Sequence, residues 1–310
     1  MILSIIKTKR IHLFAIIILV FNVYSCDKKN TQEQVSDSIL SDSLQVDFVD
    51  IAQQTYINIV HSTPSPTFIS PILSDNNIPF YNDLALEFDN NMLKRNIQQQ
   101  AFLQGLLSTD LSYLNNYKKS FMSLSYYNEV KLLASNIGIE KFYNTENFKK
   151  FVAFKNNSDS LLAFTLTDFI QVMEFNEKKS DPHNITLNIL FGAWLESLYL
   201  ISEIEKRNSL KDLKKLVLLQ NINAQRLLEL YKICPSTYFN VLIMKELVKI
   251  NDAFNQLPYS IKFKEIEVKN IDHEFYTFEK FDVTLHNDNL ELKELQQQIK
   301  SSREKLLRKF

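Results

Sequence analysis

The stretch GLLSTDLSYLNNY, residues Gly105–Tyr117, places one carboxylate on a helical face of leucine and tyrosine side chains. Side chains three and four positions apart share one face of a helix. At these distances from Asp110 all the residues are apolar or aromatic: Leu106, Leu107, Tyr113 and Leu114. Because an apolar face marks a helix packed against a core, the sequence predicts that Asp110 lies inside a helical domain.

A second stretch, GAWLESLYL at Gly192–Leu200, repeats this arrangement around Glu196. A bare buried carboxylate costs several kcal/mol, so each carboxylate must be hydrogen-bonded, paired or protonated. In one hypothesis Asp110 and Glu196 face one another across a cleft as an acid/base or cation-binding pair. In the other, each accepts hydrogen bonds inside the core from Tyr, Arg, Lys or a helix end. We prefer the second, because structural networks perturb carboxylates as readily as active sites do. It predicts that loss of either carboxylate destabilises the fold.

The aromatic residues of the two stretches define a candidate ligand site. If the protein binds a small molecule between these helices, we expect a concave pocket lined by Tyr113, Trp194 and Tyr199. If it does not, the same side chains belong to the core network around Asp110 and Glu196.

Apolar spacings of three and four residues predict successive helices along the rest of the chain. Gly138 is expected to end one of them in a left-handed conformation, and Pro64, Pro235 and Pro258 mark other boundaries. Short loops between long helices favour antiparallel neighbours. The fold class is therefore all-α, either an antiparallel multi-helix bundle or an irregular helical array. Its predicted helices are 48–60, 67–74, 82–93, 96–117, 119–136, 145–154, 158–177, 183–207, 209–233, 236–256 and one from about 288 onward.

Residues 259–287 interrupt the helical pattern. The segment IKFKEIEV alternates at first, and FYTFEKFDV is aromatic and acidic without a convincing period. A hairpin, an extended strap and an ordered loop all fit this short non-helical segment. The helix that follows carries an apolar stripe too short to establish a coiled coil, so we expect it to dock on the body.

Three glycines in 310 residues exclude several classes of function. Their positions, Gly105, Gly138 and Gly192, leave no phosphate-binding glycine motif and no hydrolase nucleophile elbow. No H-E-x-x-H or C-x-x-C motif is present. The histidines of the pairs His273–Glu274 and His286–Asp288 are interpreted as solvated loop residues. The sequence therefore predicts no nucleotide, no metal and no cofactor.

The N-terminus has the layout of a bacterial export signal. Basic residues at positions 7–10 precede an apolar run of fourteen residues at 11–24, shorter than the roughly 20 residues of a membrane-spanning helix. Ser25 and Cys26 close this run in a pattern that resembles the lipobox of bacterial lipoproteins. The resemblance implies cleavage before Cys26 and a membrane anchor through lipid on its thiol.

These features divide the chain into a signal peptide at 1–25, a flexible polar tether at 26–45 and an all-helical domain at 46–310. Without the signal, 32 of the 35 basic residues remain against 36 acidic residues, a formal charge of −4. Because nucleic-acid binding requires a basic excess, we do not expect it here. Lipidation of Cys26 would leave only Cys234, so the sequence predicts no disulfide and a buried thiol at Cys234.

The two stretches also carry a family resemblance. They look like the paired G-x-x-x-x-D-L-S-Y and G-x-W-x-E-x-L-Y signatures of uncharacterised helical lipoproteins of Bacteroidota, and TPSP at 63–66 fits the same pattern. The similarity covers roughly residues 56–204. It implies a helical lipoprotein of the cell envelope and brings no activity with it.

The sequence thus predicts a lipid-anchored cell-envelope protein, in the outer rather than the inner membrane, that acts as a non-catalytic scaffold or accessory subunit. The side of the membrane stays open, and an envelope protein is the expected partner. The alternatives are a small-molecule or glycan-binding lipoprotein and, third, a two-carboxylate hydrolase that uses Asp110 and Glu196.

A Cys26→Ser substitution tests the anchor. Because serine cannot carry a thioether-linked lipid, we expect the protein to move from the membrane to the soluble fraction or to persist as an uncleaved precursor. Fractionation and immunoblotting measure both outcomes. Normal maturation with unchanged membrane partitioning would contradict the lipoprotein interpretation.

Overall fold

The computed structural model describes residues 54–66, 68–142, 184–233, 237–271, 274–287 and 289–308. These residues all belong to one unit, Phe48–Phe310. The predicted signal peptide and tether with Cys26, the predicted helices at 145–154 and 158–177, and Cys234 lie outside the described residues.

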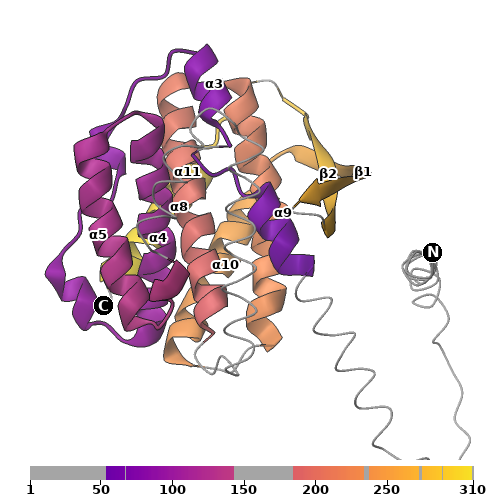
Figure 1. Cartoon of the computed structure of the whole chain (residues 1–310). Helices are drawn as coiled ribbons and strands as arrows, with labels where there is room; N and C mark the ends of the chain where they lie inside the picture. The colour runs from indigo at the N-terminus through magenta and orange to yellow at the C-terminus, as the bar shows by residue number, and fades with distance from the viewer. Residues whose placement is uncertain are drawn as a thin grey trace, which may run out of the picture. The chain divides into compact units, whose positions relative to one another are not determined.

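Most of the predicted helices are confirmed (Figure 1). Gly138 adopts a φ of 78° directly after one of them, as predicted for a left-handed helix end. The first described helix covers 54–62. The others are α3 (Ser70–Asp75), α4 (Ile97–Asn116), α5 (Ser120–Asn136), α8 (Ile185–Asn208), α9 (Lys211–Ile233), α10 (Tyr238–Asn255) and α11 (Lys293–Arg308).

The helix predicted at 82–93 is wrong. This segment contains two short 3-10 turns, Asn82–Leu84 and Asn90–Lys94, with extended residues between them; a third such turn is Glu140–Phe142. The backbone of Leu86 explains the difference, because its N–H donates to Asp110 and its carbonyl accepts from the Tyr126 hydroxyl. Tertiary hydrogen bonds thus replace the helical ones that the local pattern favours.

Residues 259–285 form a β-hairpin, so the all-α prediction holds only approximately. Strands β1 (Tyr259–Ile271) and β2 (Glu274–Leu285) pair antiparallel, with a bulge at Lys264 between Phe263 and Glu265. Aromatic and β-branched residues favour this pleated ribbon over a helix. Of the three structures that the sequence left open for this segment, the hairpin is the one observed.

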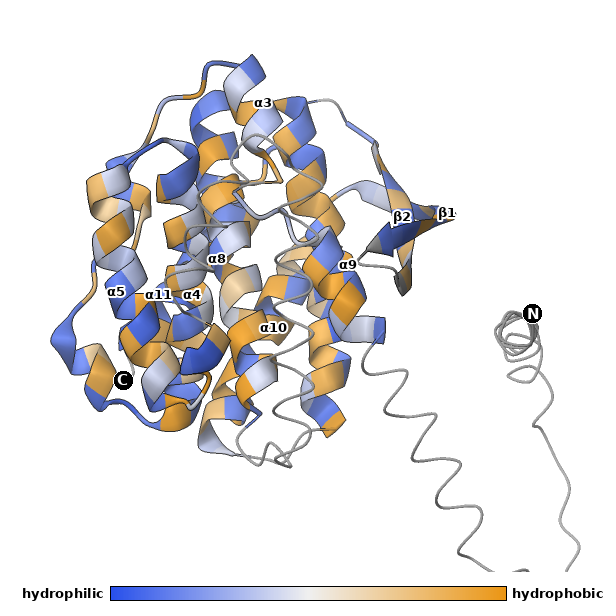
Figure 2. Ribbon diagram, in the orientation of Figure 1, coloured by the Kyte–Doolittle hydropathy of each residue, from blue (hydrophilic) through white to orange (hydrophobic). Residues whose placement is uncertain are grey.

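Helix α8 forms the centre of the described body. It is the one described helix that is long and apolar enough to cross a membrane, yet 94% of its most apolar window is buried inside the protein. Figure 2 shows the apolar surfaces of α4, α8 and α10 turned toward one another. The apolar composition of α8 is therefore that of a core helix.

Helices α4 and α8 touch backbone to backbone. A Cβ atom on Gly105 would lie 2.1 Å from the carbonyl oxygen of Ile189, and one on Gly192 would lie 2.1 Å from the carbonyl oxygen of Phe102. Only glycine allows this distance. One turn further on, Thr109 donates a 3.3 Å hydrogen bond to the carbonyl oxygen of Ala193, which adds to the contact.

The two helices run in the same direction. Ala101 and Ile189 share one cluster near the start of both helices, and Asp110 meets Glu196 further along both. The antiparallel prediction rests on short loops, and it applies to α4 and α5, which only residues 117–119 connect. It fails for α4 and α8, because the chain returns through α5 before α8 begins.

Gly105→Ala and Gly192→Ala should each lower the melting temperature, although alanine is the better helix former by about 1 kcal/mol. The added methyl group would collide with backbone atoms, and overpacking of this kind costs about 1 to 3 kcal/mol. The helix-propensity gain of about 1 kcal/mol offsets part of this cost, so we expect a decrease of up to about 4 °C in a thermal unfolding experiment, at roughly 2 °C per kcal/mol for a domain of this size.

The control is Gly138→Asn, because asparagine tolerates the left-handed conformation and no atom lies within 4 Å of a Cβ built at this position. It should change the melting temperature least of the three. A stabilising effect of alanine at Gly105 or Gly192 would contradict the close contact.

Candidate functional site

Asp110 and Glu196 lie together in the core, each with no exposed surface. The Leu86 N–H donates a 2.8 Å hydrogen bond to Asp110 Oδ2, and the Asp110 carboxyl group lies close enough to Glu196 for the two side chains to interact directly. The two carboxylates are therefore neighbours, a feature that the first sequence hypothesis also required. They meet inside the protein, however, and not across an open cleft.

Arg303 of α11 neutralises Glu196. Its Nε and Nη2 atoms donate to the two carboxylate oxygens at 2.6 and 2.7 Å, the bidentate geometry that is strongest for this pair. The guanidinium also lies 4.2 Å above the ring of Tyr199. Arg303 is itself buried, and its pairing with Glu196 raises its pKa against the effect of burial.

The charges of this cluster balance if Asp110 carries a proton. Burial first, and the charge of Glu196 second, raise the pKa of Asp110 well above its ordinary value of 3.8. Asp110 Oδ1 has no hydrogen-bond partner among the described residues, so it is the oxygen on which we place the proton, next to the Glu196 carboxylate. One cation, one anion and one neutral acid then share the buried site, which avoids an uncompensated charge.

This network has the character of a structural element. Four side chains from three helices satisfy one another without surface access: Asp110 (α4), Glu196 and Tyr199 (α8) and Arg303 (α11). Neither carboxylate has exposed surface in this structure. Among the described residues, no three His, Cys, Asp or Glu side chains cluster in a way that could hold a metal ion.

The sequence analysis missed Arg303. A signal for it exists, because Arg303 lies four residues after Ile299 and three before Leu306 on the apolar stripe of the C-terminal helix. A cation on such a face must have a buried partner, just as a carboxylate must. α11 docks against α8 and α10, so the predicted docking of the C-terminal helix on the body is confirmed.

Tyr113 and Trp194 do not join the carboxylate network. The Tyr113 hydroxyl accepts a 3.0 Å hydrogen bond from the Tyr81 N–H. The Trp194 Nε1 donates to Gln220 Oε1 at 3.2 Å, and Gln220 donates in turn to the backbone of Ser62. Both aromatic side chains are fully buried, so neither lines a concave surface.

The half of the hairpin furthest from Tyr259 and Leu285 packs one of its two faces against the helix at 54–62. Phe278 is fully buried and stacks on His61 with 3.9 Å between ring centroids. Gln54 donates a 2.9 Å hydrogen bond to the carbonyl oxygen of Thr277. Burial and then the charge of Lys269 lower the pKa of His61 to about 4, so the stacked imidazole is neutral near pH 7.

The bulge at Lys264 decides which side chains share the opposite face. Directly paired residues of antiparallel strands point to the same side, as do alternate residues of one strand. Phe263 pairs with Phe281, and Ile266 pairs with Glu279. Because Phe281 and Glu279 are alternate residues, Phe263 and Ile266 lie on one face despite a separation of three.

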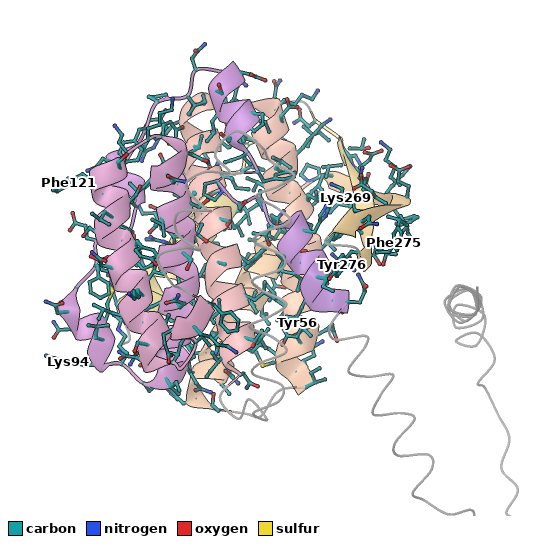
Figure 3. All side chains as sticks on the ribbon, in the orientation of Figure 1. Tyr56, Lys94, Phe121, Lys269, Phe275 and Tyr276 are labelled. Atoms are coloured by element: carbon teal, nitrogen blue, oxygen red, sulfur yellow. The ribbon has the colours of Figure 1, made fainter. Side chains whose placement is uncertain are left out.

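By the same register this face, here called the outer face, carries Phe263, Ile266, Val268 and Phe275. Their exposed fractions are 57%, 59%, 60% and 68%. Figure 3 shows the Phe275 label at the far edge of the hairpin, away from the helices. By the same register Thr277 and Glu279 lie on this face between them. An exposed face that gathers apolar side chains with polar ones around them can mark an interaction site.

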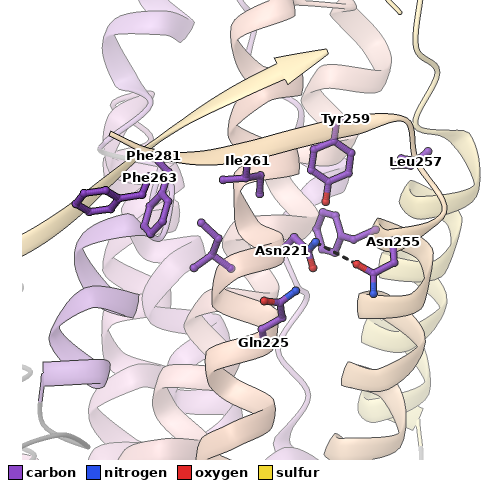
Figure 4. Close-up of a pocket in the computed structure, with 10 residues that line it drawn as sticks. Asn221, Gln225, Asn255, Leu257, Tyr259, Ile261, Phe263 and Phe281 are labelled. Atoms are coloured by element: carbon purple, nitrogen blue, oxygen red, sulfur yellow. Dashed lines mark hydrogen bonds between the residues drawn. The ribbon is translucent and has the colours of Figure 1, made fainter. Parts of the chain in front are cut away.

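A pocket of about 380 Å³ lies beneath the base of the hairpin, far in sequence from the predicted ligand residues. Figure 4 shows it between β1, the middle of α9 and the C-terminal end of α10. Its lining is amide, aromatic and aliphatic: Asn221, Ile222, Gln225, Phe254, Asn255, Leu257, Tyr259, Ile261, Phe263 and Phe281. This pocket could not be predicted from the sequence, because the hairpin and the helices approach each other only in the folded protein.

Comparison of the chain with protein-family models, with curated proteins and with solved structures gives no match.

The geometry predicts different losses of stability for the two carboxylate substitutions, whereas the sequence alone predicts that both destabilise the fold. Glu196→Gln would leave Arg303 buried without its anion, and breaking such a pair costs about 3 to 5 kcal/mol. Asp110→Asn should change stability by only about 1 kcal/mol, because its carbonyl can accept from Leu86 while its amide donates to Glu196. Chemical denaturation near pH 7 measures both.

The pH dependence of Asp110→Asn tests the shared proton. The raised pKa means that the contribution of Asp110 to stability is complete below pH 3.8 and falls as the pH rises toward the folded pKa. The loss is up to about 1.4 kcal/mol per pH unit. Asparagine does not titrate, so the variant should gain stability relative to wild type as the pH rises above 3.8 toward the folded pKa of Asp110.

Asp83→Asn is the matched control. A hydrogen bond from Arg207 lowers the pKa of Asp83, so its contribution is complete above pH 3.8 and is lost only as the pH falls. Its difference from wild type should stay constant over the same range. A constant difference for Asp110→Asn as well would refute the shared proton.

Proposed function

We propose that this chain is a lipid-anchored protein of the cell envelope that acts as a non-catalytic scaffold or accessory subunit. The observation that carries the proposal is the outer face of the hairpin. The occupant that fits it best is an apolar surface of another envelope protein.

The hairpin needs packing contacts with other parts of the protein, or with a partner, to be stable. A two-stranded hairpin in water is marginally stable at best, and its docked face is anchored by Phe278 on His61. The outer face has four exposed apolar side chains, and each strand has one edge without a neighbouring strand. A partner that covers the face removes apolar area from water and can also pair with an edge, a common mode of protein recognition.

The buried carboxylate network supports a non-catalytic role over the hydrolase alternative. In glycoside hydrolysis, for example, two carboxylates flank a substrate in an open site. Here both have no exposed surface, and one is held by Arg303. Their interactions with each other and with Arg303 connect α4, α8 and α11.

The location rests on the sequence. The basic and apolar N-terminus that ends at Cys26 and the resemblance to helical lipoproteins of Bacteroidota both favour the envelope. An anchored protein reaches partners in or near the same membrane, and the polar segment from Asp27 to Gln45 would allow a reach of roughly 25 Å.

Photocrosslinking in intact cells tests the proposal. We expect benzoylphenylalanine in place of Val268 to give a discrete crosslinked product with another envelope protein, because Val268 is 60% exposed at the centre of the outer face. A Phe275→Asp substitution in the same chain should abolish this product by placing a charge in the apolar contact.

The control position is Phe121 on α5, which is 93% exposed and lies on the side of the body away from the hairpin (Figure 3). Crosslinker at Phe121 should not give the same product. The proposal fails if Val268 yields no product, if Phe121 yields an identical one, or if Phe275→Asp leaves it unchanged.

A further inference from the structure

The pocket beneath the hairpin combines an amide floor with an aromatic rim. Asn221 is only 8% exposed, and its Nδ2 donates a 3.3 Å hydrogen bond to Asn255 Oδ1. This leaves Asn221 Oδ1, which has no hydrogen bond of normal geometry among the described residues. A buried acceptor without a donor is costly, and a bound ligand can supply the missing hydrogen bond.

The remaining polar groups of the pocket also both donate and accept. Gln225 is exposed at the opening. Burial raises the pKa of Tyr259 to about 12, partly offset by Asn221 beside it, so its hydroxyl keeps its proton near neutral pH. Three carboxamides and one phenol therefore line the pocket, and each of these side chains offers a donor as well as an acceptor.

The aromatic rim lies on one side of these groups. Phe263 and Phe281 meet edge to face with 5.9 Å between ring centroids. Phe263 is more than half exposed, so its ring has surface free for a ligand at the mouth of the pocket. Figure 4 shows both phenyl groups beside the amide side chains of α9 and α10.

The pocket carries no charge of its own. None of its lining residues is ionised near neutral pH. Outside the lining, Arg226 lies 5.8 Å from the centre of the Phe281 ring, and its charge is paired with Glu279. An ionic ligand would therefore lose its hydration without a compensating partner, so the site favours a neutral ligand.

We propose that this pocket binds a neutral sugar ring of a glycan. Sugar hydroxyl groups donate and accept hydrogen bonds, which matches the carboxamides and the phenol, and the C–H face of a pyranose ring packs on an aromatic side chain. The volume of about 380 Å³ falls within the range of about 300 to 1,000 Å³ that is common for ligand pockets. The inference does not depend on a protein partner at the outer face.

A peptide is the competing ligand. It too offers amide donors and acceptors, but it would bind an extended strand edge more naturally than a concave pocket with an aromatic rim. The pocket faces the side of β1 that carries Tyr259, Ile261 and Phe263, and not its backbone edge. The geometry therefore favours the sugar.

Titration calorimetry with the purified full-length chain tests the assignment. The probes are neutral trisaccharides, namely maltotriose, cellotriose, mannotriose and chitotriose, together with end-blocked trialanine. We expect saturable binding of at least one sugar. Gln225→Ala and Phe263→Ala should each weaken it roughly tenfold, because each removes a contact that the ligand makes.

Phe275→Ala is the matched control, since Phe275 is an exposed phenylalanine of the same hairpin that does not line the pocket. It should leave sugar affinity unchanged, and circular dichroism should show all three variants folded. The proposal is overturned if no sugar binds in the millimolar range, if Phe275→Ala weakens binding as much as Phe263→Ala, or if only trialanine binds.

Discussion

The close approach of α4 and α8 at Gly105 and Gly192 is the constraint on which the described structure depends. A Cβ atom at either position would meet a carbonyl oxygen at 2.1 Å, so no other residue allows this distance between the two backbones. The approach brings Asp110 and Glu196 into contact further along the same two helices. The glycines and the carboxylates are therefore two parts of one interface.

The contact of two acids then determines what the C-terminal helix must supply. A pair of buried carboxylates needs one proton and one cation. Arg303 provides the cation from a position 107 residues after Glu196 in the chain, and so the charge requirement of the α4–α8 interface fixes the position of α11. Burial of this network keeps its two acids away from solvent.

Surfaces that can bind other molecules lie instead on the hairpin and beneath it. The bulge at Lys264 changes the register so that Phe263, Ile266 and Val268 share one face. At the base of the hairpin this face covers the middle of α9 and the C-terminal end of α10 and closes the pocket around Asn221. Further out it is exposed. One irregularity in one strand thus contributes to both the proposed partner surface and the proposed sugar site.

The sequence by itself determined most helices, the left-handed end at Gly138, and the burial of Asp110 and Glu196, because helical spacing shows which side chains share a face. It did not determine which faces meet. The parallel contact of α4 and α8, the recruitment of Arg303, the loss of the helix at 82–93 and the pocket under the hairpin all join residues distant in the chain. Such contacts depend on the packing of the whole fold, and tertiary hydrogen bonds at Leu86 can outweigh a local helical preference of a few tenths of a kcal/mol per residue.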